Sequence, residues 1–439
     1  MDRSEIIALD RAHVWHPYTP MDEWVGIDPI VVASAQGAWL EDIDGTRYLD
    51  GNSSWYVATL GHAHPRLLRV LAEQSVRLAH CSLAGIAHEP AARLAAELVD
   101  IAPRDAGRRL TRVFFVDDGS TAVDAAVKMC AQAWCQLGAP KKTRFVALDG
   151  AYHGDTLGAV SLGGVEVFRR PFAGVTFECV RAAFPSDDAY DGAFSEIRRL
   201  LREGGDTIAA VFVEPIVQGV AGMRVYDAAY LRELRTLCDR YDVLLVADEV
   251  FTGYGRTGPM WACEQAGVAP DVMCIGKALA GIIPMGAVLA TERVLSAFDG
   301  GRAKAFLHGH TFSGNPLGAA LAREVLAIYR EERVIEQAAR HARVIERAFE
   351  RLSGVGGVER VRTIGMIGAA DLMQPAGEAH RDGYLGAIGW RVYEEARKRG
   401  AYLRPLGRTV YVTPPLTIGH EDLERLLAIL EESVRAALS

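Results

Sequence analysis

The chain has 439 residues, of which 50% are hydrophobic and 24% are charged. This composition is typical of a globular protein with a large apolar core, and the length predicts more than one folding unit. The net charge of −8 is spread along the chain without a basic stripe, which argues against nucleic acid as a partner. The start, MDRSEIIALD, lacks a secretory apolar core, and no apolar run matches a membrane span. We therefore expect a cytoplasmic protein with no membrane partner.

The first 60 residues are expected to form an irregular arm and short strands. Turn signals occur at Asp44-Gly45 and Asp50-Gly51. We expect this segment, 1–60, to pack with a small domain at 326–439. Residues 61–325 then form the large domain between them.

From about residue 110 to 291, short β-branched or aromatic runs alternate with longer helical patterns. Runs this apolar are typical of strands covered on both faces, with helices as the crossovers of a mostly parallel sheet. We therefore predict an α/β fold, followed after Asn315-Pro316 by a helix and a smaller α+β domain. The predicted strands lie at 112–116, 144–150, 209–215, 243–250, 272–279 and 286–290.

An acid and a lysine end two consecutive predicted strands. Asp248 ends the run in VLLVADEV, and Lys277 follows the next run in DVMCIGKAL. The carboxyl ends of parallel strands meet at one crevice, so we expect the two side chains to converge there. A carboxylate can keep a pyridine nitrogen protonated while an amine forms a Schiff base with an aldehyde cofactor. An ordinary buried salt bridge is the alternative that these two residues leave open.

A candidate anion site follows the strand at 112–116. The segment DDGSTAVDAAVKM places Gly119, Ser120 and Thr121 at the start of an Ala-rich helix. Free backbone N–H groups and the helix dipole favour a phosphate at such a position. A plain Gly-Ser turn with an N-cap is the alternative.

The segments LVADEV, TGYGRTG and IGKAL resemble the class III aminotransferases, which are fold-type I enzymes that use pyridoxal 5′-phosphate. The resemblance implies that Lys277 carries the cofactor and that Asp248 contacts its pyridine nitrogen. It also implies that Tyr152, in GAYHGDT, lies over the cofactor ring, with Asp155 as a local hydrogen-bonding residue. For Glu214 it implies a place near the phenolic oxygen, and a loop cap is the alternative.

Segments near both ends of the chain resemble one branch of this class. That branch transfers an amino group from S-adenosylmethionine to 8-amino-7-oxononanoate in biotin biosynthesis, by a two-step exchange through one pocket. The segments are HVWHPYTPM at 13–21, GNSSWYVATLGH at 51–62, LHGHTFSGNPL at 307–317 and LRPLGRTVYVTPPL at 403–416.

The acceptor of that branch needs an aromatic slot and a fixed cation, because it has a methylene chain and a terminal carboxylate. We expect Tyr18, Trp55 and Tyr56 to form the slot. Tyr152 and Lys277 are expected to bind the substrate as well. Arg404 is expected to bind the carboxylate with its planar guanidinium. The resemblance adds one further pocket position, Tyr411.

The loop at 309–311 is expected to complete a site in a homodimer. The resemblance implies that Gly309, His310 and Thr311 line the site. It also implies that the backbone at 310 and the Thr311 hydroxyl reach the phosphate bound by the neighbouring subunit. The active sites would then lie at the dimer interface.

Two substitutions leave the amino donor open. His310 replaces the proline of many S-adenosylmethionine-using relatives, and Tyr56 replaces a second tryptophan, as in relatives that use lysine. We favour S-adenosylmethionine as the donor and keep lysine as the alternative. Another class III ω-amino acid or diamine transaminase is a further alternative. A cofactor-binding sensor is the non-enzyme alternative, although no helix-turn-helix segment with a basic face precedes this domain.

Three other patterns are weaker. Gly253, Gly255 and Gly258 match GxGxxG, but no following helix, strand and acidic residue support a dinucleotide site. The pairs His62/His64 and His308/His310 lack a further ligand at metal spacing. The seven cysteines form no CxxC pair, so we expect no metal and no disulfide framework.

Overall fold

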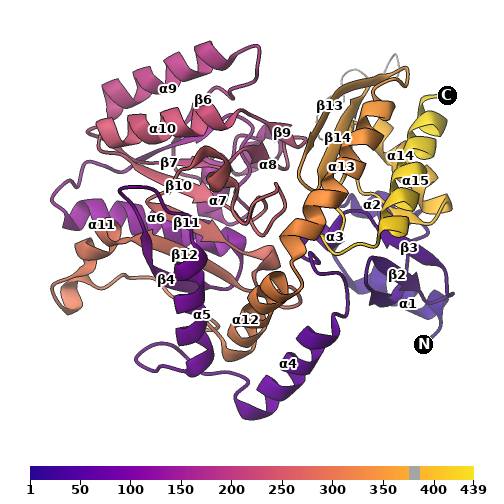
Figure 1. Cartoon of the computed structure of the whole chain (residues 1–439), viewed down its shortest axis with the longest axis horizontal. Coiled ribbons are helices and arrows are strands. Elements are labelled where there is room, and N and C mark those ends of the chain that lie inside the picture. The colour runs from indigo at the N-terminus through magenta and orange to yellow at the C-terminus, as the bar shows by residue number, and fades with distance from the viewer. Residues whose placement is uncertain (375–385) are drawn as a thin grey trace.

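A seven-stranded sheet dominates the part of the chain that this computed structural model describes, residues 1–374 and 386–439 (Figure 1). The five strands β11-β10-β7-β5-β6 run parallel, whereas β12 is antiparallel to both of its neighbours. The predicted α/β fold with a mostly parallel sheet is therefore confirmed. In sheet order the strands are β4 (Leu110–Val116), β12 (Gly286–Thr291), β11 (Val272–Ile275), β10 (Leu244–Asp248), β7 (Ile208–Val213), β5 (Arg144–Leu148) and β6 (Cys179–Ala182).

All six predicted strands are present, but β5, β7, β10 and β11 end earlier than predicted, and one further strand was not predicted. Strands β7 and β11 end earlier than the apolar runs, so Glu214 and Lys277 lie in the loops that follow them. Strand β6 is absent from the prediction. It is a short edge strand, and the half-buried Arg181 interrupts its apolar run.

Apolar side chains from both faces of the sheet pack into two separate cores. Val211 and Leu245 belong to one core, whereas Phe212 and Leu244 belong to the other. Successive side chains of a strand point to opposite faces, so each face must be covered by helices. Helices α9 (Tyr190–Gly204) and α10 (Ala228–Arg240) cover the first face, and α6 (Gly119–Gln136) covers the second.

Further helices complete the large domain and its link to the C-terminal part. They are α4 (Pro65–Arg77), α5 (Glu89–Ile101), α7 (Leu157–Leu162), α8 (Glu166–Arg169), α11 (Glu292–Leu295) and α12 (Pro316–Glu331). A short hairpin, β8 (Val217–Gln218) and β9 (Arg224–Val225), follows β7. Among the described helices, none is long and apolar enough to cross a bilayer.

The C-terminal part forms a smaller α+β unit. Strands β13 (Val358–Ile364), β14 (Ile367–Leu372) and β16 (Thr409–Val412) form an antiparallel sheet. Helices α13 (Val334–Leu352), α14 (Ile388–Lys398) and α15 (His420–Leu438) pack beside it (Figure 1). Strand β15 (Ala401–Tyr402) leaves this unit and pairs with the N-terminal strand β3 (Arg47–Asp50). The two ends of the chain are therefore joined in one region.

The prediction of an irregular N-terminal arm was wrong for its first part. Residues Arg3–His13 form helix α1, which begins where the Asp2 carboxylate accepts a hydrogen bond from the N–H of Glu5. No residue of α1 is buried, so its sequence carries no strong apolar periodicity. Helix α2 (Met21–Trp24) and strands β1 (Val32–Gln36) and β2 (Trp39–Asp42) precede β3.

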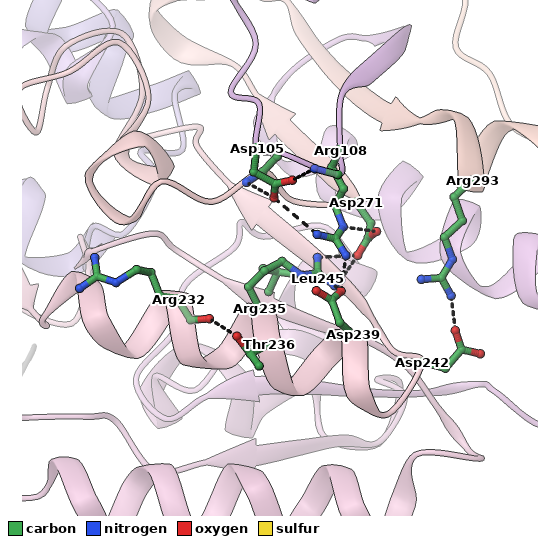
Figure 2. Close-up of polar contacts among 12 residues, drawn as sticks. Asp105, Arg108, Arg232, Arg235, Thr236, Asp239, Asp242, Leu245, Asp271 and Arg293 are labelled. Carbon is green, nitrogen blue, oxygen red and sulfur yellow. Dashed lines mark hydrogen bonds and ion pairs between the residues drawn. The ribbon is translucent and has the colours of Figure 1, made fainter.

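A buried ionic cluster fixes the start of β10 and β11 (Figure 2). Arg235, on α10, places Nη1 2.7 Å from Oδ2 of Asp271, and the same oxygen accepts from the N–H of Leu245 at 2.8 Å. Burial opposes the charge on Arg235, but the neighbouring carboxylates outweigh it and raise the pKa of the guanidinium. The surrounding members of the cluster are Asp105, Arg108 and Asp239.

Breaking this cluster is expected to destabilise the protein. In Asp271→Asn, the buried guanidinium of Arg235 loses its buried carboxylate partner and keeps only Asp239, whose side chain is 37% exposed. We expect the free energy of unfolding to fall by about 3 kcal/mol. Urea unfolding of the holoenzyme measures the change.

The matched control is Asp242→Asn, which breaks the ion pair with Arg293 in the same region (Figure 2). These side chains are 65% and 38% exposed, and exposed pairs contribute about 1 kcal/mol or less. Equal losses in the two variants would contradict the assigned role of the buried pair.

Candidate active site

A cavity of about 840 Å³ opens at the carboxyl ends of the sheet strands. Residues that follow β4, β5, β7, β10 and β11 contribute to its wall, as expected for a ligand crevice of an open α/β sheet. The predicted site residues that line it are Tyr18, Trp55, Tyr56, Gly119, Ser120, Tyr152, Glu214, Asp248, Lys277, Arg404 and Tyr411.

Lys277 lies two residues beyond the end of β11, on a short 3₁₀ turn, with φ at +45°. Its surroundings lower the pKa of the amine. The first cause is burial, which outweighs the opposing charges of Asp248 and Glu214. A lowered pKa leaves more of the amine neutral near pH 7, and only the neutral amine is a nucleophile. The position is thus suited to covalent chemistry with a carbonyl group.

The Asp248 carboxylate is held by His153, which no spacing in the sequence singles out. The only signal for His153 is its place next to Tyr152 in GAYHGDT. His153 Nδ1 lies 2.7 Å from Asp248 Oδ2, and both side chains are buried. Burial lowers the pKa of His153, but the hydrogen bond to Asp248 and the nearby carboxylates outweigh burial, so the pKa is raised. The raised pKa favours the cationic form of His153, which would support the Asp248 carboxylate at the cavity wall.

Glu214 joins two loops beneath the cavity. Its carboxylate oxygens accept from the N–H groups of Tyr152 and Gly219, each at 2.9 Å. Burial raises the pKa of this carboxyl to about 7, although His153 and the two N–H groups oppose the shift. Glu214 therefore has the geometry of a loop cap, and it also lines the cavity.

The raised pKa of Glu214 predicts a specific dependence of stability on pH. Between its ordinary pKa of 4.5 and about 7, the folded protein keeps a proton that the unfolded chain has lost. Stability therefore falls as pH rises through this window, by at most about 1.4 kcal/mol per pH unit. Glu214→Gln should flatten this part of the profile in urea unfolding between pH 4.5 and 8.

The control is Glu350→Gln, at an exposed position of α13. This variant should keep the wild-type slope. A Glu214→Gln profile that parallels the wild-type profile throughout the window would count against the raised pKa.

The start of α6 forms an anion cradle. Asp118 caps the helix, because its carboxylate accepts from the N–H of Thr121 and the Thr121 hydroxyl accepts from the N–H of Asp118. The N–H groups of Gly119 and Ser120 are left without an acceptor inside the helix. A Cβ atom on Gly119 would collide with Val250. Only glycine therefore permits this close approach of the helix start to the loop after β10.

Four consecutive non-glycine residues form a left-handed turn at the mouth of the cavity. This is α3 (Ser53–Tyr56), with φ values of +47°, +45°, +59° and +72°. Left-handed backbone costs about 1 to 2 kcal/mol for each L-residue, so surrounding contacts must hold the turn. The turn directs Trp55 and Tyr56 to the cavity wall, where Tyr56 lies 4.5 Å from the ring of Phe251.

Aromatic side chains extend this wall from three segments. The Tyr18 hydroxyl donates to Asp155 and lies 3.2 Å from the Tyr152 hydroxyl. The ring of Phe168, on α8, lies 5.4 Å from Tyr18 and 5.9 Å from Tyr152. Phe168 is a lining residue that the sequence does not indicate, because its segment carries no motif. These rings make one side of the cavity apolar.

Arg404 closes the opposite end of this wall. Its guanidinium carbon lies 5.2 Å from the ring centre of Trp55 and 5.5 Å from that of Trp390. Cation–π contacts of this kind orient the guanidinium plane. Tyr411, on β16, lies beside it, with its hydroxyl 3.0 Å from that of Tyr56. The cavity therefore has a cation at the end of an aromatic slot.

The loop with Gly309, His310 and Thr311 does not line this cavity. His310 Nδ1 lies 3.4 Å from Asp117, and Lys128 holds the loop by donating to the carbonyl of Leu307. The structure therefore does not bring these three residues together with Lys277 in one chain. The expected contact with a neighbouring subunit stays a prediction.

Fold and cavity together define an α/β enzyme whose chemistry centres on a buried amine. Residues 21–434 match the aminotransferase class-III family. The adenosylmethionine-8-amino-7-oxononanoate aminotransferase of Nitratidesulfovibrio vulgaris is 42% identical, over 98% of this chain and 81% of the relative. The crystal structure of the protein with this name from Methanocaldococcus jannaschii superposes with a TM-score of 0.93 at 31% identity, over 99% of each chain.

An ω-transaminase from Pseudomonas jessenii, solved in complex with PMP, superposes with a TM-score of 0.91 at 27% identity, over 98% of each chain. The chain belongs to the class-III aminotransferases, a family of pyridoxal-phosphate-dependent transaminases. The predicted resemblance to this family is confirmed.

Proposed function

We propose that this enzyme transfers an amino group from S-adenosylmethionine to 8-amino-7-oxononanoate, giving 7,8-diaminononanoate for biotin synthesis. One observation carries the proposal. The cavity that holds Lys277 and Asp248 continues into an aromatic slot that ends at Arg404. This arrangement suits an acceptor with an apolar chain and a terminal carboxylate. The likeness to relatives named for this reaction supports the same assignment.

The residues of the cavity fit pyridoxal 5′-phosphate. Lys277 would hold the aldehyde carbon, and Asp248, supported by His153, would contact the ring nitrogen. The N–H groups of Gly119 and Ser120 offer donors for the phosphate, in a cradle that a Cβ atom on Gly119 would disrupt. The bound cofactor supplies an electron sink for negative charge at the substrate Cα.

The protein side chains have distinct roles in the proposed reaction. Lys277 would hold the cofactor aldehyde through Nζ, and the same amine would take up the proton that leaves the donor Cα. Asp248 would keep the ring nitrogen protonated, because a carboxylate close to it favours the charged form. Tyr152 would cover the ring, and Asp155 accepts hydrogen bonds from the hydroxyls of Tyr152 and Tyr18. The aromatic wall excludes water from the acceptor chain.

The first experiment follows each half-reaction by the visible absorbance of the holoenzyme. We expect S-adenosylmethionine to bleach the absorbance, and 8-amino-7-oxononanoate to restore it with formation of 7,8-diaminononanoate, detected by mass spectrometry. Lys277→Ala is the control and should turn over neither substrate. Bleaching by lysine alone would identify lysine as the donor.

Two other outcomes would replace the proposal. Turnover of a diamine without turnover of 8-amino-7-oxononanoate would assign the enzyme to the diamine transaminases. An absorbance that no amine changes would indicate a cofactor-binding sensor.

Arg404 is expected to determine affinity for the acceptor carboxylate. Removing one partner of a charged hydrogen bond costs about 1.5 to 3 kcal/mol, so Arg404→Met should raise the KM for 8-amino-7-oxononanoate about 10- to 100-fold. Steady-state kinetics with each substrate varied in turn measures this change. An unchanged KM would place the carboxylate elsewhere.

The proposed enzyme is a cytoplasmic homodimer. The loop that contains Gly309, His310 and Thr311 lies outside the cavity of its own chain and is flanked by the exposed side chains of Leu307 and Phe312. Exposed apolar side chains of this kind are suited to contact with a second copy. In such a dimer, the Thr311 hydroxyl would reach the phosphate bound by the neighbouring subunit.

A further inference from the structure

We infer that Asp50 and Asn52 are positioning residues that hold the substrate slot in its working shape, although neither lines the cavity. The inference rests on the proposed function, because it assigns the slot to the long acceptor. It extends that proposal from the residues of the slot wall to the buried groups that support the wall.

Asp50, the last residue of β3, is buried with 1% of its surface exposed. Its Oδ2 atom accepts from the Ser54 hydroxyl at 2.8 Å and lies 2.8 Å from Nε2 of His62. Its Oδ1 atom accepts from the N–H of Asn52 at 3.3 Å. One carboxylate therefore contacts the chain before, within and after the left-handed turn.

The Asp50 carboxylate matters because the left-handed turn needs contacts that hold it in place. L-residues leave the left-handed region unless their surroundings hold them there. Ser54 and Trp55 both lie inside this region, and the Ser54 hydroxyl bonds directly to Asp50. Without that bond, we expect the turn to relax and Trp55 to leave its place beside Arg404.

Asn52 connects the same turn to the other end of the slot. Its Oδ1 atom accepts from the N–H of Arg404 at 2.7 Å, and its Nδ2 atom lies 3.5 Å from the carbonyl oxygen of Tyr411. Asn52 is fully buried. The neighbouring Ser53 hydroxyl donates to the carbonyl of Thr413 at 2.7 Å. The aromatic wall and the carboxylate-binding end of the slot are therefore fixed by one short segment.

Lys277 and Asp248 depend on other elements, which makes the inference testable. They lie beyond β11 and β10 of the large sheet, whereas Asp50 belongs to the four-stranded sheet β1-β2-β3-β15. Loss of Asp50 should therefore change acceptor binding and leave the cofactor chemistry in place.

The test compares Asp50→Asn with the matched control Asp42→Asn in the holoenzyme. Asp42 is a buried aspartate of the same sheet, and it accepts from the N–H groups of Asp44 and Thr46 without contact to the turn. We expect Asp50→Asn to raise the KM for 8-amino-7-oxononanoate about tenfold, with kcat changed less than threefold. Borohydride labelling of Lys277 should match the wild type. Asp42→Asn should keep the wild-type KM.

A double-mutant cycle separates positioning from a general loss of stability. In a Trp55→Ala background, where the slot has lost the ring that the turn presents, Asp50→Asn should raise KM less than twofold further. The milder variant Ser54→Ala, which removes a single hydroxyl, should raise KM in the same direction as Asp50→Asn. Urea midpoints of every variant record whether it is folded.

Three results would overturn the inference. They are a KM within twofold of the wild type in Asp50→Asn, an equal rise in Asp42→Asn, and an undiminished effect in the Trp55→Ala background. Wild-type turnover of the keto acid tests the proposed function by itself. The KM of each variant relative to the wild-type KM tests the positioning role. The two proposals can therefore fail independently.

Discussion

The buried ion pair between Arg235 and Asp271 fixes the geometry on which the active site depends. Asp271 binds both the guanidinium and the N–H of Leu245, so it sets where β10 and β11 begin relative to each other. Each strand is only four or five residues long. A fixed start therefore determines where Asp248 and Lys277 emerge at the opposite edge of the sheet.

At that edge, two buried groups are driven toward the protonation states that the chemistry needs. Burial lowers the pKa of Lys277, which favours the neutral nucleophile. The hydrogen bond to Asp248 raises the pKa of His153 in spite of burial, which favours a cation beside the carboxylate. Within one cavity, the pKa of an amine is therefore lowered and the pKa of an imidazole is raised, because the two groups have different surroundings.

The slot has a different physical origin, because it is assembled from the two ends of the chain. The left-handed turn Ser53–Tyr56 supplies Trp55 and Tyr56, and the segment around β16 supplies Arg404 and Tyr411. The strained turn is held by hydrogen bonds from the Ser54 hydroxyl to Asp50 and from the N–H of Tyr56 to the carbonyl oxygen of Asn52. Strained backbone of this kind is tolerated at functional sites because it presents side chains that a relaxed turn would direct elsewhere.

The sequence alone determined the α/β fold and the pairing of Asp248 with Lys277 at one edge of its sheet. Apolar runs covered on both faces predict buried strands, and a parallel sheet brings the residues at the ends of its strands to one edge, so Asp248 and Lys277 could be placed together. The place of Tyr152 came from the resemblance to the family. The motifs also indicated the family. Local patterns carry this information because the burial of a strand is visible in the apolar character of consecutive residues.

Only the tertiary structure decided which buried groups support those residues. His153 beside Asp248 and Phe168 beside Tyr18 are contacts between segments far apart in the chain. Asp50 contacts Ser54 only four residues further on, but that contact depends on the left-handed backbone of the turn, which no periodicity of the sequence encodes. Helix α1 was missed for a related reason, because it buries no residue and so leaves no apolar pattern. Long-range hydrogen bonds and packing depend on how whole elements are arranged in the fold. The spacing of residues along one sequence does not specify that arrangement.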